Sequence, residues 1–299
     1  MQLLLDGNPF FPGTVTIRES VFEYGSVLSF TSNMPLIFEE ITLQISENIP
    51  YVPVVIEQLD VASYQYVCYP KGYVDFLQNV SRCVSVTTDL PGLLDSLSVC
   101  DYICYHKTQS THWILPSLRG KNLLDELTNR VTSVNGGCPT FHFGVSGKLI
   151  FSDLLVECGS DYAGEFFGTL SKSRSSTASM NTTPGKVNFV FYDDDTFTDE
   201  SATFQEGTGV SNVFRYVVNK DTENQVISEM QSRYWRKFVA NSLRSYDNVQ
   251  SPSISPGVKV RNLHSEEEFI CVASVATITA DNTELSVQLF PVIKPEQML

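Results

Sequence analysis

The feature that most constrains this chain is an abrupt change of hydrophobic period between Thr222 and Phe290. From Thr222 to Asn248 apolar residues recur at helical spacing, which predicts one long amphipathic helix. Two Ser-Pro steps, at 251–252 and 255–256, then forbid continuation of that helix. After Gly257 apolar and polar residues alternate, which predicts three strands in VKVRNL, FICVASVATI and ELSVQLF. The C-terminal quarter therefore combines a helix with a small β unit.

The first part of the chain has the same alternation in short segments separated by Gly, Pro and Asn turns. Regular spacing of this kind predicts a small antiparallel barrel or sandwich, built from LLLDGNPFF, TVTIRES, GSVLSFTS, EEITLQIS, PVVIEQL and YQYVCYP. Apolar residues at helical spacing predict a short helix between Lys71 and Val80.

The middle of the chain mixes element types. RCVSVTT and CDYICYH indicate strands, and LPGLLDSLSV is an apolar segment that is either helical or irregular. A helix is predicted from Asn122 to Val134, ended by Gly136-Gly137, and PTFHFGVSGKLIFSDLL predicts a hairpin turning at Ser146-Gly147. Farther on, VNFVFY indicates a strand, YDDDTFTDE an exposed acidic segment, and GVSNVFRYVVN the approach to the long helix.

We therefore expect a β-rich α+β protein with a small β unit at each end, a mixed helix and hairpin region between them, and one long helix before the C-terminal unit. That both units are small antiparallel β-barrels is what the family resemblance described below implies. The expected division is an N-terminal β-barrel at 1–88, a mixed helix and hairpin region at 89–171, a flexible Ser/Thr-rich loop at 172–186, and strands, long helix and C-terminal β-barrel at 187–299. A chain of 299 residues is long enough for such a division.

Composition excludes several classes of protein. The formal net charge is −14 and the pI is about 4.7, so an acidic surface would repel both DNA phosphate and anionic membranes. No apolar run approaches the length of a membrane span, and the start of the chain does not resemble a signal peptide, so folding in a cytosol is expected. Seven scattered cysteines favour buried thiols, with crosslinking after release into an oxidising medium as the alternative.

Two groups of residues could hold a metal ion. Cys100, Cys104, His106 and His112 have a spacing loosely typical of zinc sites, but residues four apart on a strand lie about 13 Å from one another, too far for one zinc ion. Asp193, Asp194, Asp195, Asp199 and Glu200 lack the glycine and terminal glutamate of an EF-hand, so a solvated acidic loop is favoured over calcium binding.

Motifs for catalysis are missing from the sequence. Four histidines, His106, His112, His142 and His264, stand in unrelated contexts. No serine, including Ser110 near His112, lies in a nucleophile-elbow motif, and neither a GxGxxG nor a P-loop motif occurs. We therefore expect no catalytic residues, no cofactor and no bound metal.

The order of elements at the C-terminus resembles the baseplate hub proteins of phage tails and related contractile injection machines. The residues that match are Pro256, Gly257, Val258 and Val260, followed by Phe269, Val272 and Val275. A second similar patch is the helix LLDELTNRVTSVNGG followed by the hairpin TFHFGVSGKLIF.

This resemblance implies a structural subunit, not an enzyme: a homotrimer whose two barrels per chain form a ring that joins the sixfold tail tube to the threefold central spike. The implied partners are further copies of the chain, the tail tube protein, the central spike protein and other baseplate subunits. DNA would only pass through the lumen, with no membrane insertion, and the protein would reside in the virion after assembly in the host cytoplasm. The alternative is a virion-associated glycan-binding protein or cell-wall hydrolase, marked by a cleft with convergent carboxylates or exposed aromatic residues.

Two expectations concern single residues. A DNA channel should be lined by acid, with Glu39, Glu40, Glu284 and the loop from Asp193 as candidates, unless the acids are spread over the outside for solubility. Trp235, together with Tyr234, Phe238 and Val239 of the long helix, should pack on the C-terminal barrel. The alternative is that Trp235 is exposed and anchors a partner.

Overall fold

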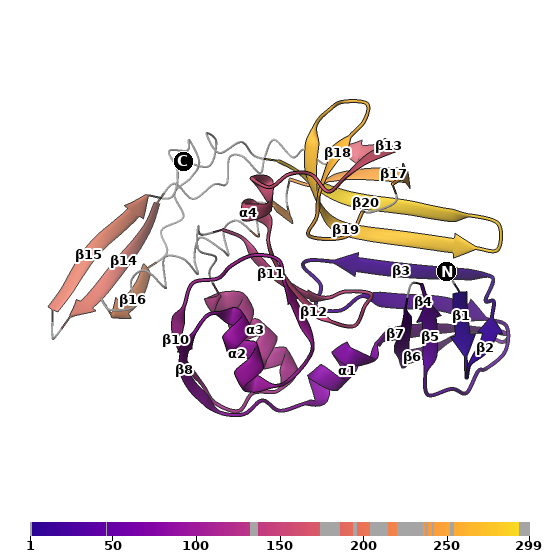
Figure 1. The fold of residues 1–299 in the computed structure, drawn as a ribbon, viewed down its shortest axis with the longest axis horizontal. Coiled ribbons are helices and arrows are strands. Elements are labelled where there is room, and N and C mark those ends of the chain that lie inside the picture. The colour runs from indigo at the N-terminus through magenta and orange to yellow at the C-terminus, as the bar shows by residue number, and fades with distance from the viewer. Residues whose placement is uncertain are drawn as a thin grey trace.

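The computed structural model describes residues 2–45, 47–131, 137–173, 186–193, 196–203, 215–219, 236, 239–240, 242–251 and 254–292. Within these ranges the chain is a β-rich α+β protein, as the sequence predicts. Most of its strands belong to one twelve-stranded sheet, and three smaller sheets and four helices accompany it (Figure 1).

The N-terminal part contributes seven strands to the large sheet, all with antiparallel neighbours, in the order β3-β4-β7-β6-β5-β1-β2. Their bounds are β1 (Gln2–Leu5), β2 (Asn8–Phe10), β3 (Thr14–Ser20), β4 (Val27–Ser32), β5 (Ile41–Gln44), β6 (Asn48–Asp60) and β7 (Ser63–Pro70). Because side chains alternate across a strand, every second residue enters one core, which includes Leu28, Phe30 and Tyr66. Phe30 and Tyr66 stack there with ring centroids 5.0 Å apart.

The C-terminal part contributes five strands whose pairings form a ring. They are β13 (Gly164–Ser173), β17 (Arg244–Gln250), β18 (Lys259–Asn262), β19 (Glu268–Thr279) and β20 (Thr283–Pro291). Each pairs with the next in the order β18-β13-β17-β20-β19, and β19 pairs back with β18. A second core of Phe166, Tyr246, Phe269 and Leu289 lies among them.

The two parts are joined directly by backbone hydrogen bonding. Strand β19 runs antiparallel to β3, from the pair Ala273–Ser20 to the pair Thr279–Thr14. This seam merges residues from the two ends of the sequence into one sheet (Figure 1).

The middle region builds its own core from helices and short strands. Its elements are α1 (Lys71–Gln78), β8 (Val84–Thr88), α2 (Leu90–Leu97), β9 (Tyr102–Cys104), β10 (Thr111–Leu115), α3 (Gly120–Arg130), β11 (Pro139–Phe143), β12 (Leu149–Asp153) and α4 (Leu154–Cys158). Trp113 is buried in this core, donates its indole N–H to the Thr88 carbonyl at 3.2 Å and carries the Arg130 guanidinium 5.0 Å above its ring. A separate sheet holds β14 (Lys186–Asp193), β15 (Thr196–Thr203) and β16 (Arg215–Asn219).

Most strands lie where the sequence predicts them, and so do the short helix α1 and the β11–β12 hairpin. Five predictions need correction, the last of them at the end of the long helix. The middle helix ends at Arg130 instead of Val134, and Leu154 begins α4 instead of continuing the hairpin. The acidic segment expected to be a loop is the strand β15 from Thr196 onward, and Lys172 and Ser173 of the expected loop belong to β13.

The long helix is corrected at its C-terminal end. Arg236, Val239 and Ala240 are helical, but Arg244–Gln250 forms strand β17, so the helix does not reach Asn248. Here pairing with β13 and β20 overrides the helical pattern. The remaining residues of the predicted helix, with Tyr234, Trp235 and Phe238, lie outside the described residues.

Candidate assembly surfaces

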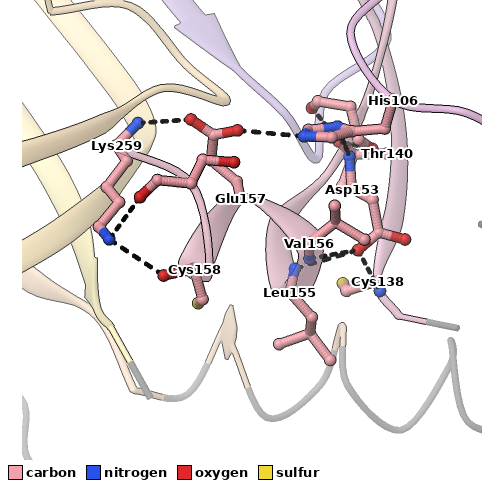
Figure 2. A network of polar contacts seen from close by, with 11 residues as sticks. His106, Cys138, Thr140, Asp153, Leu155, Val156, Glu157, Cys158 and Lys259 are labelled. Carbon is pink, nitrogen blue, oxygen red and sulfur yellow. Dashed lines mark hydrogen bonds and ion pairs between the residues drawn. The ribbon is translucent and has the colours of Figure 1, made fainter. Parts of the chain in front are cut away.

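A buried polar network joins the middle region to the C-terminal ring of strands (Figure 2). Asp153 at the end of β12 is fully buried and caps α4, accepting hydrogen bonds from the backbone N–H groups of Leu155 and Val156 at 3.0 and 3.2 Å. The same oxygen accepts the N–H of Cys138 at 3.0 Å. One carboxylate thus fixes the start of α4 and the strand segment beside it.

His106 and Glu157 continue this network. The His106 Nδ1 accepts the Asp153 N–H at 3.0 Å, so the ring proton lies on Nε2, which donates to Glu157 Oε2 at 3.1 Å. The other Glu157 oxygen accepts the backbone N–H of Lys259 at 3.2 Å.

Lys259 on β18 closes the network. Its buried ammonium donates to the carbonyls of Cys158 and Ser160 at 3.0 and 2.7 Å and pairs with Glu268 at 2.9 Å. All three ammonium protons therefore have acceptors, and the charge lies at the C-terminal end of α4, where the helix dipole favours a cation. The sequence gives no signal for this contact, because Glu157 and Lys259 are 102 residues apart.

The cysteine and histidine residues considered for zinc have separate environments. Burial raises the pKa of the Cys100 and Cys104 thiols to about 12 and 11. His106 belongs to the network above, whereas the exposed His112 on β10 contacts Thr87 at 2.9 Å. Across the part of the chain that is described, no three His, Cys, Asp or Glu side chains are grouped to hold a metal ion.

The other histidines and the cysteines can also be placed. His142 is buried on β11, and burial lowers its pKa to about 4, while His264 is exposed after β18. All seven cysteines are free thiols, and Cys68, Cys138, Cys158 and Cys271 are buried.

The acids considered for a channel lining are spread over the molecule. Glu39 is exposed before β5, and Glu40 pairs with Lys71 at 3.3 Å. Glu284 is exposed on β20. Asp199 and Glu200 lie on strand β15, Asp193 ends β14, and Asp194 and Asp195 fall outside the described residues.

Eight successive strands of the large sheet alternate strictly in direction, in the order β13-β17-β20-β19-β3-β4-β7-β6. Both ends of this run have a free edge. Among the described strands, none pairs with the outer edge of β6 beyond Tyr51, or with that of β13 beyond Phe166. Such edges present unpaired N–H and C=O groups that can accept another strand.

The free edge of β6 is also apolar. From Val54 to Asp60 every residue is exposed, and Val54, Val55, Ile56 and Leu59 expose about half of their surface, between 46% and 57%. At the opposite edge, Phe167 and Leu170 of β13 are 53% and 49% exposed. Apolar exposure on a projecting strand is typical of an interaction surface.

One face of the eight-stranded run covers the cores of the N-terminal and C-terminal strands, and the other face mixes polar residues with a few apolar ones. On β3 this outer face carries Thr14, Thr16, Arg18 and Ser20, whose register partners on β19 are Thr279, Thr277, Val275 and Ala273. None of these side chains is buried. Toward β17 the face is hollowed by about 310 Å³.

The helices in the described ranges are all too short or too polar to span a membrane. No protein-family model matches the sequence, and no curated protein matches it either.

Solved structures do match the fold. It is similar to the 43 kDa tail protein of prophage MuSo2 from Shewanella oneidensis, with a TM-score of 0.64 and 12% identity over 100% of this chain and 99% of that chain. It is also similar to a tail protein from Neisseria meningitidis MC58, with a TM-score of 0.62 and 11% identity over 99% and 97% of the two chains.

A third match comes from a secretion system. It is an E. coli component of the type VI secretion system that is described as structurally similar to the T4 bacteriophage tail proteins gp27 and gp5. Its TM-score is 0.56, with 10% identity over 100% of this chain and 79% of that chain. The resemblance to tail hub proteins is thus confirmed at the level of the fold: the chain has the fold of phage tail proteins, which a component of the type VI secretion system shares.

Proposed function

We propose that this protein is a structural subunit of a phage tail baseplate, a trimeric hub ring that joins the sixfold tail tube to the threefold central spike. The observation that carries the proposal is the eight-stranded run with a free edge at each end. It is supported by the likeness in fold to tail proteins.

The directions of the two edge strands favour a ring. In a run of eight alternating strands the first and the last are antiparallel, so the β13 edge of one copy can add to the β6 edge of the next without breaking the alternation. Because the two edges are different surfaces, the contact is heterologous, and heterologous contacts that close produce rings.

Three copies of eight strands give a closed sheet of twenty-four strands. With strands about 4.8 Å apart, its circumference is about 115 Å and its diameter roughly 37 Å between backbones. Such a ring is wide enough for a DNA duplex to pass.

Within each chain we propose two similar units, an N-terminal barrel at 1–88 and a C-terminal barrel within 187–299, linked by the mixed region at 89–171 and the loop at 172–186. The β18–β19 pairing supports the second barrel, although β13 from the mixed region completes its ring of strands. Six such units in a trimer would match the sixfold tube, and the threefold axis would match the spike. Other baseplate subunits would bind the outside, and the protein would be assembled in the host cytoplasm and reside in the virion.

The role we propose is not enzymatic. A cell-wall hydrolase would need convergent carboxylates in a cleft. The hollow on the outer sheet face has Glu23 and Asp247 in its lining, but Glu23 is paired with Arg18 at 3.2 Å. No feature of this hollow favours the hydrolase or the glycan-binding alternative.

Assembly can be tested with two matched substitutions. Ile56→Lys places a charge on the β6 edge, and Ile114→Lys places one on β10, where the isoleucine is 66% exposed against 57% for Ile56. Light scattering of the protein, alone and with its spike partner, should give a trimer for the wild type and Ile114→Lys and a monomer for Ile56→Lys. A wild-type monomer in the presence of the spike would refute the proposal, as would equal assembly of the two variants.

A further inference from the structure

Strands β8 and β10 form a separate two-stranded ribbon beside the helices of the middle region (Figure 1). On its inner side Trp113 and Leu115 are buried in the core of that region. The last pair of the ribbon is Val84 with Leu115. An isolated bridge between Val80 and Arg119 lies four residues farther along both strands (84 minus 80 and 119 minus 115). The antiparallel pairing therefore continues in the same register as far as the start of α3.

The outer edge of β10 is free. Among the described strands, β8 alone pairs with β10. Many proteins protect such an edge with charged side chains. The sequence of β10, THWIL, contains no Lys, Arg, Asp or Glu, and Ile114 on the side away from the core is 66% exposed. The backbone groups of this edge, with an apolar side chain among them, are thus open to an added strand.

Positive charge gathers at one end of this edge. Arg82 and Arg119 are exposed on the two paired segments, and the exposed Lys121 follows in the first turn of α3. In the continued register Arg82 lies diagonally across from Arg119, which corresponds to a spacing of about 7–8 Å. None of the three forms an ion pair with another described residue. In a chain with a net charge of −14, this end of the ribbon is a local cationic site.

The small number of cations favours a carboxylate partner. Proteins that hold duplex DNA commonly neutralise about 6–10 phosphates, more than these three side chains can reach. Arginine forms two parallel hydrogen bonds with one carboxylate, so a few acidic residues are enough to occupy the site.

We propose that the free edge of β10 binds an extended segment of another protein that ends in acidic residues and adds to the ribbon as a third strand. In this binding mode main-chain hydrogen bonds supply affinity, and side-chain contacts supply specificity. Apolar residues of the segment would contact Ile114, and its carboxylates would contact Arg82, Arg119 and Lys121. The site is separate from the β6 and β13 edges, so the inference does not depend on the proposed ring.

The test selects peptides from a random-sequence display library on the immobilised full-length protein. We expect the selected sequences to alternate apolar and polar residues and to carry Asp and Glu at one end. The tightest binder is then synthesised with a fluorophore, without modification and in two methylated forms. Each methylated form carries methyl groups on one of the two alternate sets of backbone nitrogens, and only the set that faces β10 should prevent strand pairing.

Two variants test the charge. One carries Arg82→Glu and Arg119→Glu, and the matched control carries Lys107→Glu and Lys148→Glu at positions that are also exposed. We expect the unmodified peptide to bind the wild type and the control equally, and the Arg82→Glu, Arg119→Glu variant at least tenfold more weakly. One methylated form should bind the wild type at least tenfold more weakly than the other. Melting temperatures should agree among the three proteins.

The outcomes that would overturn the proposal differ from those that bear on the ring. Equal peptide binding by all three proteins would exclude a role of the cations, and equal binding of the two methylated forms would exclude strand addition. A library that yields no binding peptide would overturn the site altogether. Displacement of the peptide by a short DNA duplex would assign the cations to nucleic acid instead, and a wild-type dimer that the peptide dissociates would assign the edge to a second copy of the chain. Trimer formation, read by light scattering, can fail or succeed without changing any of these results.

Discussion

Asp153 provides the sharpest stability test in the molecule. Its carboxylate accepts three backbone N–H groups, two at the start of α4 and one from the buried Cys138. Asp89 has the same role at the start of α2, but it is exposed and accepts one backbone N–H, from Gly92 at 3.1 Å. The two aspartates therefore compare a buried cap with an exposed one.

The expected loss of stability follows from the backbone N–H groups that lose their hydrogen-bond acceptor. Loss of an N-cap side chain costs about 1 kcal/mol, which is all that Asp89→Ala should lose, because water reaches the freed N–H. Asp153→Ala should lose this amount and about 2–3 kcal/mol more for the Cys138 N–H, which would be buried without an acceptor. Asp153→Asn keeps one acceptor oxygen and should lose only about 1 kcal/mol.

Urea unfolding, followed by both fluorescence and circular dichroism, gives the free energy of unfolding where the two transitions coincide. The expected order of stability is wild type, then Asp89→Ala and Asp153→Asn together, then Asp153→Ala. If Asp153→Ala and Asp89→Ala fell within about 1 kcal/mol of each other, the buried cap would not stabilise the junction as we describe.

Three further predictions concern substitutions of single residues. Burial lowers the pKa of His142 to about 4, below its unfolded value of about 6.5, so its contribution to stability is complete above pH 6.5 and about 3 kcal/mol is lost by pH 4. His142→Phe should remove that part of the pH dependence of the unfolding free energy in urea titrations. An unchanged dependence of the unfolding free energy on pH would contradict this prediction. Lys259→Met should leave Glu268 and the carbonyls of Cys158 and Ser160 without their shared donor, which should lower the melting temperature by several degrees. An unchanged melting temperature would show that the buried ammonium is dispensable. Gly72→Ala should destabilise the protein by more than 1 kcal/mol in urea titrations, because a Cβ there meets the Gly147 carbonyl, and a neutral effect would mean that the hairpin turn moves aside freely.

The strands could be predicted from sequence because alternation is a local signal. The pattern Thr14 to Ser20 defines β3 wherever its partner is, since every second side chain must enter a core. Pairing is not local. The residues of β3 contain no signal that identifies β19 as the neighbouring strand. The joining of the two ends of the chain in one sheet could therefore not be predicted.

Competition between local and tertiary preference explains the error at β17. Val239 and Leu243 continue a helical stripe, yet Tyr246 and Val249 are buried as strand residues beside β13 and β20. The candidate surfaces follow the same rule. The outer face of the eight-stranded run and the free edges depend on strand order, and the buried contact of Glu157 with Lys259 depends on a close approach of distant segments.

The seam between β3 and β19 also has a consequence for synthesis on the ribosome. Ile17 pairs with Ala276, 259 positions later in the chain (276 minus 17). At about 5–20 residues per second, β3 waits on the order of 10–50 s for its partner to be made. During that time one edge of the N-terminal sheet is open, and open edges recruit other strands. Nascent chains crowded on one messenger are thus at risk of pairing with each other at β3, and a holdase chaperone that covers this edge would raise the yield of folded protein.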